Sequence, residues 1–141
     1  LIDFDGTCVA HDFPRIGKDI GAVPVLKELV KNGHNLILFT MRADRDKATP
    51  TLTQGIENVT GKFLTEAINW FKENDIPLYG IQTNPTQHNW TTSPKAFGHL
   101  MIDDTALGCP LLIDLESGKP YVDWQRVYFF LVSNGFLKHG M

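Results

Sequence analysis

Several features that would place this chain in a specialised class of protein are missing. Only two cysteines occur among the 141 residues, and they form no CxxC pair, which argues against a small disulfide-linked scaffold and favours free thiols in the cytoplasm. No apolar run approaches the ~20 residues of a membrane-spanning helix. No signal peptide is recognisable, and because Leu1 already lies in an expected strand, we expect further residues to precede it.

An excess of positive charge is missing as well. The 13 lysines and arginines are outnumbered by 16 acidic residues, giving a formal net charge of −3, which argues against a general attraction to nucleic acid or anionic lipid. What is present is an ordinary globular composition, with 43% hydrophobic and 21% charged residues. The length and the lack of a linker or repeat predict a single domain over residues 1–141.

Apolar patterns typical of strands and of helices alternate along the chain. Short apolar runs predict strands at residues 1–4, 35–39, 78–82 and 99–102. Three- and four-residue spacing predicts helices at about residues 23–32 and 63–71. The alternation favours an α/β fold, a three-layer, Rossmann-like, mainly parallel sheet flanked by helices. Two extended pieces and a helix capped by Asp123, within residues 111–137, are expected to complete the core.

Polar side chains follow the expected strands at one edge of the sheet. Ligands of open parallel sheets bind outside the carboxyl ends of the strands. The residues expected there are Asp3, Asp5, Thr40, Asp103 and Asp104, with Lys95 in the loop before the fourth strand. Crowded carboxylates repel one another and raise their pKa values unless a cation is present. Mg²⁺ is the expected ion, because it prefers oxygen ligands and leaves places for water and phosphate oxygens.

These residues occur in four ordered segments that resemble the signatures of the haloacid dehalogenase superfamily. The segments are IDFDGT at residues 2–7, the Thr40 ending of LILFT, Lys95, and IDD at residues 102–104. Most members of that superfamily are Mg²⁺-dependent phosphohydrolases. The resemblance implies that Asp3 attacks phosphorus to form an aspartyl-phosphate and that Asp5 is the general acid and then the general base. Asp5 also favours phosphoryl over halide chemistry, because the dehalogenases lack an aspartate there.

The resemblance implies a set of metal ligands as well. Mg²⁺ would be held by the carboxylates of Asp3 and Asp103 and by the backbone carbonyl of Asp5, with Asp104 either a further ligand or a support for the others. A soft-metal site is disfavoured, because the spacing of its candidate ligands matches no zinc pattern. Those candidates are Cys8, His11 and Cys109.

Phosphate binding is assigned to residues around the same edge. The resemblance implies that Thr40 donates a hydrogen bond to a phosphate oxygen and that Lys95 neutralises phosphate charge and orients Asp3, with Lys62 the alternative lysine. Gly6 permits a tight turn with close approach to the ligand. Met41 and Arg42 directly follow Thr40 and are assigned to the same site. The basic side chains of this stretch are either solvated or bind a second anionic group of the substrate; they are Arg42, Arg45 and Lys47.

The intervals between the signatures leave no room for a cap domain. The chain therefore resembles the capless members, whose open site suits either a bulky phosphorylated substrate or a smaller one enclosed by the neighbouring subunit of a homo-oligomer. The connections at residues 43–61 and 83–94 are the expected specificity elements. Two alternatives stay open, a non-catalytic module that binds metal and phosphate for regulation, and a phosphatase that acts on nucleic-acid ends.

Overall fold

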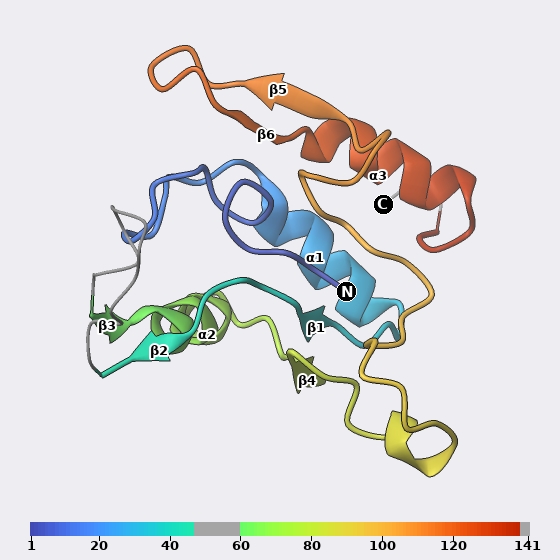
Figure 1. The fold of residues 1–141 in the computed structure, drawn as a ribbon. Coiled ribbons are helices and arrows are strands. Elements are labelled where there is room, and N and C mark those ends of the chain that lie inside the picture. Colours follow the sequence, from blue (N-terminus) through green and yellow to red (C-terminus); the bar gives the residue numbers. More distant parts are fainter. Residues whose placement is uncertain (47–59, 139–141) are drawn as a thin grey trace.

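A small parallel sheet lies at the centre of the fold, which a computed structural model describes over residues 1–46 and 60–138 (Figure 1). Strand β1 (Ile37–Leu38) pairs in parallel with β4 (Gly80–Ile81). On the other side of β1, Ile2 forms parallel bridges to both Leu38 and Ile102. Four segments thus run side by side in the order 80–81, 37–38, 2 and 102, all in one direction.

The regular strands are shorter than the apolar runs that predict them. Runs 1–4 and 99–102 contribute single bridges, at Ile2 and Ile102. The first segment ends early because the carbonyl of Phe4 accepts hydrogen bonds from the amides of the following residues, which turns the chain. Strand β4 ends where Gln82 adopts a left-handed φ of 65°. The expected parallel α/β sheet is therefore present in a small form.

Three α-helices accompany this sheet in the described ranges, and they lie where the spacing predicts them. They are α1 (Ala22–Lys31), α2 (Phe63–Glu73) and α3 (Trp124–Ser133). The buried positions of α1 recur at helical spacing and are Ala22, Val25, Leu26 and Leu29. Asp123 caps α3 by accepting a hydrogen bond from the amide of Arg126, as expected. None of these helices has the length and apolar character needed to cross a bilayer.

The helices form two groups around the sheet. Figure 1 shows α1 and α3 next to each other, in contact, while α2 lies apart from them beside β2 (Asp44–Arg45). Side chains from the sheet and from all three helices join in one buried hydrophobic cluster. Within it, the Phe4 ring packs edge-on against Trp70 and also contacts Phe71, both on α2. The aromatic packing fixes the segment just before Asp5 against α2.

Two antiparallel pairs complete the described structure. Strand β2 pairs with β3 (Gly61–Lys62), so the two ends of the 43–61 connection form a ribbon rather than an irregular loop. The middle of that connection, residues 47–59, which includes Lys47, lies outside the described residues. Strands β5 (Leu111–Ile113) and β6 (Pro120–Val122) form the expected hairpin before α3. A short 3₁₀ helix, η2 (Gln87–Asn89), lies in the 83–94 connection.

Candidate active site

Three carboxylates meet at the carboxyl edge of the sheet. Because Ile2 and Ile102 are aligned in parallel, the residues that follow them, Asp3 and Asp103, leave the sheet at the same edge. Carboxylate oxygens of Asp3, Asp103 and Asp104 lie within 4.8 Å of one another, the sort of group that could hold a metal ion. Asp104 is buried, whereas Asp3 and Asp103 are half-buried. The structure thus brings together three of the four predicted acids.

The hydroxyl of Thr7 links two of these acids by hydrogen bonds. Its hydroxyl is completely buried and donates a 2.7 Å hydrogen bond to Oδ2 of Asp3. The same hydroxyl oxygen accepts a hydrogen bond from the backbone amide of Asp104 at 3.0 Å. The indole nitrogen of Trp124 donates to the carbonyl of Thr7 at 2.7 Å. Core packing of α3 therefore holds Thr7, and Thr7 holds Asp3 and Asp104.

The tight turn at Gly6 makes this approach possible. Gly6 has a φ of 81°, and its amide donates to the carbonyl of Val9 at 2.7 Å. A Cβ atom at this position would lie 2.1 Å from Nε2 of His11 and 2.6 Å from Oδ2 of Asp104. Only glycine fits between these side chains without displacing them.

His11 belongs to the site although the sequence did not indicate it. Its Nε2 lies 2.7 Å from Oδ2 of Asp104. The contact forms because the chain folds back after Asp5, which bridges to Val9. His11 follows no expected strand or helix, so no pattern in the sequence placed it beside Asp104, 93 positions away. Within the described ranges, the group of side chains that could hold a metal ion includes neither His11 nor the two cysteines Cys8 and Cys109.

The environment of Asp3 alters its acidity. Burial raises the pKa of Asp3 to about 7, and the nearby carboxyls of Asp104 and Asp103 also raise it, while hydrogen bonds from Thr7 and from the amide of Phe4 oppose the shift. Near neutral pH, a proton therefore neutralises part of the negative charge of the three-acid group, which consists of Asp3, Asp103 and Asp104. A divalent cation at this position would favour the ionised Asp3.

The carboxylate of Asp5 points to Arg42 and is not part of the three-acid group. Arg42 donates from Nε to Oδ2 and from Nη2 to Oδ1, each at 2.8 Å. The remaining donors reach backbone carbonyls, those of Pro14, Arg15 and Phe63. Whether the backbone carbonyl of Asp5 ligates a metal stays a prediction.

Arg42 corrects one interpretation of the sequence. The side chain is 1% exposed, so it is not a solvated charge. Its guanidinium lies 5.0 Å from the ring centroids of both Phe4 and Phe13, a cation–π arrangement. Because each of its nitrogens already donates within the protein, Arg42 has no donor left for a phosphate in this structure.

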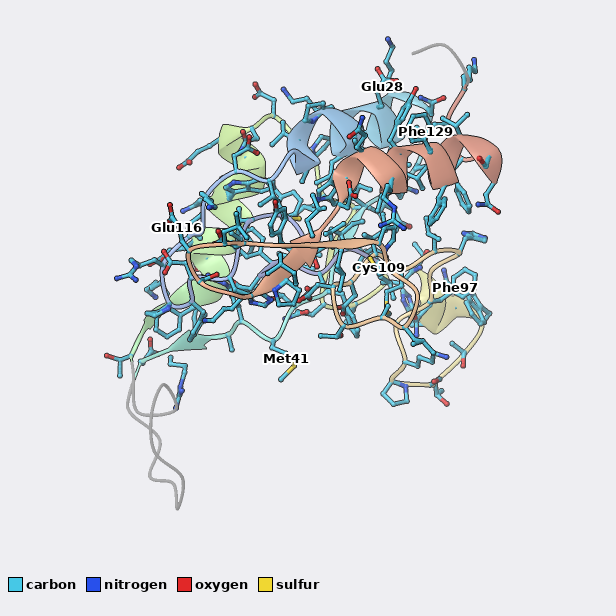
Figure 2. All side chains as sticks on the ribbon, turned by 90° about the horizontal axis from the view of Figure 1, so that it is seen from above. Glu28, Met41, Phe97, Cys109, Glu116 and Phe129 are labelled. Atoms are coloured by element: carbon cyan, nitrogen blue, oxygen red, sulfur yellow. The ribbon has the colours of Figure 1, made fainter. Side chains whose placement is uncertain are left out.

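Thr40 and Met41 lie on the turn that leads from β1 to Arg42. The Thr40 hydroxyl oxygen accepts a 3.1 Å hydrogen bond from the amide of Arg42. The hydroxyl proton has no acceptor among the described residues and is free to donate. Met41 is 98% exposed and projects away from the body of the protein (Figure 2). Its thioether lacks a donor, so any contribution of Met41 to anion binding would come from its backbone.

The structure does not bring Lys95 into contact with Asp3. Lys95 is exposed, and its side chain forms no ion pair or hydrogen bond with any residue of the described ranges. Its backbone is fixed by the buried Gln87, whose amide donates to the carbonyls of Ser93 and Lys95. Lys62, the alternative, lies on β3 opposite Asp44. The role of either lysine stays a prediction.

One solved structure is similar to the chain over most of its length. It is that of a conserved protein coded by a locus of Bacteroides thetaiotaomicron, with a TM-score of 0.66 and 32% sequence identity. The match covers 94% of this chain and 88% of the other, whose description names no activity. The chain matches no protein-family model and no curated protein.

Proposed function

We propose that the chain, which belongs to the same family as the conserved Bacteroides protein, is a Mg²⁺-dependent phosphomonoester hydrolase. The family relationship names no activity, so the proposal is based on the residues of the site. We further propose that the protein is of the capless haloacid dehalogenase type and has a Rossmann-like three-layer fold. The order of the four parallel segments, 80–81, 37–38, 2 and 102, supports this fold.

The meeting of Asp3, Asp103 and Asp104 is the observation that carries the proposal. The donor set consists of carboxylate oxygens alone, which suits a hard divalent cation such as Mg²⁺ better than a softer metal. Bound there, Mg²⁺ would neutralise charge on the acids and on the substrate phosphate, so that an anionic nucleophile can approach. The raised pKa of Asp3 supports the same interpretation, because burial and then the neighbouring carboxyls disfavour the ionised form of Asp3, and a bound cation would offset both.

Asp3 is the proposed nucleophile. A carboxylate oxygen of Asp3 forms a bond to phosphorus while the bond from phosphorus to the leaving oxygen breaks, which produces an aspartyl-phosphate and an alcohol. Thr7 holds one oxygen of Asp3 by a 2.7 Å hydrogen bond, which leaves the other oxygen to attack. The Thr40 hydroxyl donates to a phosphate oxygen, and Lys95 is assigned to the phosphate by the resemblance alone.

Asp5 is the proposed proton carrier. It gives a proton to the leaving oxygen in the first step, and in the second it takes one from the water that attacks phosphorus, which releases phosphate and regenerates Asp3. Both oxygens of Asp5 accept hydrogen bonds from Arg42 in this structure. Each of these oxygens keeps a second lone pair, which is where the transferred proton would be held.

A panel of phosphate monoesters, assayed with Mg²⁺ and with a chelator, tests the proposal. We expect hydrolysis only with Mg²⁺ and loss of at least about a thousandfold in kcat for Asp3→Asn. Asp114→Asn is the matched control, because Asp114 lies in the β5–β6 hairpin turn and pairs with Lys18. Hydrolysis that does not need Mg²⁺, or full activity of Asp3→Asn, would contradict the mechanism.

A non-catalytic module that binds metal and phosphate is the second candidate. The observation that favours it is the Arg42 pair, which occupies both oxygens of the acid that turnover requires. The same panel separates the candidates. Binding of Mg²⁺ and inorganic phosphate without hydrolysis of any ester would support the module.

A further inference from the structure

The side-chain amide of Gln82 both accepts from and donates to the backbone of the turn that carries Thr40. Its Oε1 accepts a hydrogen bond from the amide of Thr40 at 2.9 Å, and its Nε2 donates to the carbonyl of Thr40 at 2.6 Å. Nε2 also lies 3.3 Å from the carbonyl of Arg42. The Gln82 side chain thus pairs with Thr40 as the backbone of a neighbouring strand would.

The backbone of Gln82 is strained to reach this position. Gln82 has a φ of 65°, a left-handed conformation that side chains other than glycine rarely adopt. Its amide donates to the carbonyl of Leu38 at 2.7 Å, which continues the pairing of β4 with β1. Asp75 also has a positive φ, 56°, but it lies just after Asn74, the C-cap of α2, where left-handed residues are common. At a strand end such strain persists only where surrounding contacts enforce it.

Two proposed functions depend on the turn that Gln82 holds. The Thr40 hydroxyl accepts from the amide of Arg42, which leaves its own proton to donate to a phosphate oxygen. The side chain of Arg42 fixes Asp5 through two 2.8 Å hydrogen bonds. One amide side chain therefore sets the place of the phosphate donor and, through Arg42, of the proton carrier.

We propose that Gln82 is a positioning residue that holds the Thr40–Arg42 turn in register with the three-acid group. It acts on phosphate binding through Thr40 and does not touch the substrate. The inference rests on the proposed function, because Thr40 matters only if a phosphate binds beside it. Its chemical basis is that the amide offers a donor and an acceptor together, which neither a carboxylate nor an apolar side chain can do.

Gln82→Gly separates positioning from stability. Glycine relieves the left-handed strain, which offsets the loss of the amide's hydrogen bonds, so we expect a small change in melting temperature but a KM for phosphate esters raised roughly tenfold. Asp75→Gly is the matched control, since it relieves the same kind of strain away from the site and should leave KM unchanged. Gln82→Glu keeps the size of the side chain and replaces its donor with an acceptor. It should raise KM similarly and serves if the glycine variant does not fold.

A double-mutant cycle with Thr40→Ala supplies the decisive readout. If Gln82 acts through Thr40, Gln82→Gly should add little to the increase in KM that Thr40→Ala already causes. Additive increases in KM for the two substitutions, or an unchanged KM in Gln82→Gly, would overturn the inference about Gln82. Hydrolysis by the wild type in the same assay would still support the proposed function.

Calorimetric titration of inorganic phosphate into the Mg²⁺-loaded protein makes the two failures distinguishable. Roughly tenfold weaker phosphate binding by Gln82→Gly in a protein that hydrolyses no ester would support the positioning role and contradict the hydrolase. Equal phosphate affinity of wild type and Gln82→Gly would overturn the positioning role. A wild type that neither hydrolyses esters nor binds phosphate would overturn both.

Discussion

Arg42 and Asp5 form a bidentate ion pair, with both hydrogen bonds at 2.8 Å. The Arg42 side chain is 1% exposed and that of Asp5 17% exposed, so the pair is largely removed from water. The Arg42 guanidinium also ties two further segments together, since it donates to the carbonyls of the adjacent Pro14 and Arg15 and to that of Phe63. The pair is therefore both a structural tie and a restraint on the proposed proton carrier.

Removing Arg42 should destabilise the protein severely. Arg42→Ala leaves the Asp5 carboxylate and three carbonyls without their partner, so we expect the free energy of unfolding to fall by about 3–5 kcal/mol. Arg15→Ala is the control, because the Arg15–Asp12 pair is exposed and screened by solvent, so its loss should change the stability little. Urea denaturation measures both values. Equal stability losses in the two variants would contradict a structural role for the buried pair.

Stability should depend on pH through Asp3. An acid whose pKa rises on folding, here from 3.8 to about 7, binds more protons when folded, so its stabilising contribution is full below pH 3.8 and is lost as pH rises through 7. Solvent screening limits the effect to about 2 kcal/mol. In a chelator, the melting temperature of the wild type should fall relative to Asp3→Asn between pH 5 and pH 8, on the order of several degrees.

Mg²⁺ should reverse that loss. At pH 8 the ion stabilises the ionised Asp3, so the melting temperature of the wild type should rise with Mg²⁺ and that of Asp3→Asn should rise much less. Parallel pH curves for the two proteins in chelator, together with equal responses to Mg²⁺, would contradict the assignment of Asp3 to the metal site.

Gly6→Ala should weaken Mg²⁺ binding, whereas a comparable substitution of a glycine away from the site should not. The new Cβ would meet His11 and Asp104 at 2.1 Å and 2.6 Å, and it would also strain a left-handed φ of 81°. Gly118→Ala imposes similar strain, at a φ of 72°, with nothing within 4 Å. The backbone strain alone should cost each variant on the order of 1–2 kcal/mol, and Gly6→Ala should lose more, because His11 and Asp104 must also shift. Only Gly6→Ala should bind Mg²⁺ more weakly, by roughly tenfold.

His11 should support the metal site by holding Asp104. His11→Ala removes the 2.7 Å contact, and we expect the Mg²⁺ concentration for half-maximal activity to rise roughly tenfold, with kcat changed less. His11→Gln, which retains a side-chain donor, should recover part of the affinity. His88→Ala is the control, since His88 is exposed on η2. An unchanged Mg²⁺ requirement in His11→Ala would show that the contact is incidental.

Local patterns were sufficient to predict most of the elements. Helical spacing predicts a helix at about 23–32, and α1 spans Ala22–Lys31; the spacing from Phe63 likewise marks α2. These predictions succeed because a helix buries side chains that recur every three or four residues, which a single segment reveals. The strand runs predict the parallel order but overstate strand length, since the turns at Phe4 and Gln82 depend on local backbone geometry rather than hydrophobicity.

Contacts that complete the site could not be predicted in the same way. The His11–Asp104 contact spans 93 positions, the Gln82–Thr40 contact 42, and the Arg42–Asp5 pair 37. The residues next to Arg42 in the sequence do not indicate whether its side chain forms a buried ion pair or is a solvated charge. Burial is decided by what packs around a residue, here the rings of Phe4 and Phe13.

Local patterns in the chain account for the alternation of strands and helices, and for the meeting of Asp3, Asp103 and Asp104 at one sheet edge, because parallel strands present their carboxyl ends together. The side chains that restrain those acids follow instead from how the folded chain packs. Asp5 and Asp3 are two positions apart, yet one turns to a buried guanidinium and the other to the three-acid group. That division depends on hydrogen-bond partners that folding brings from distant parts of the chain.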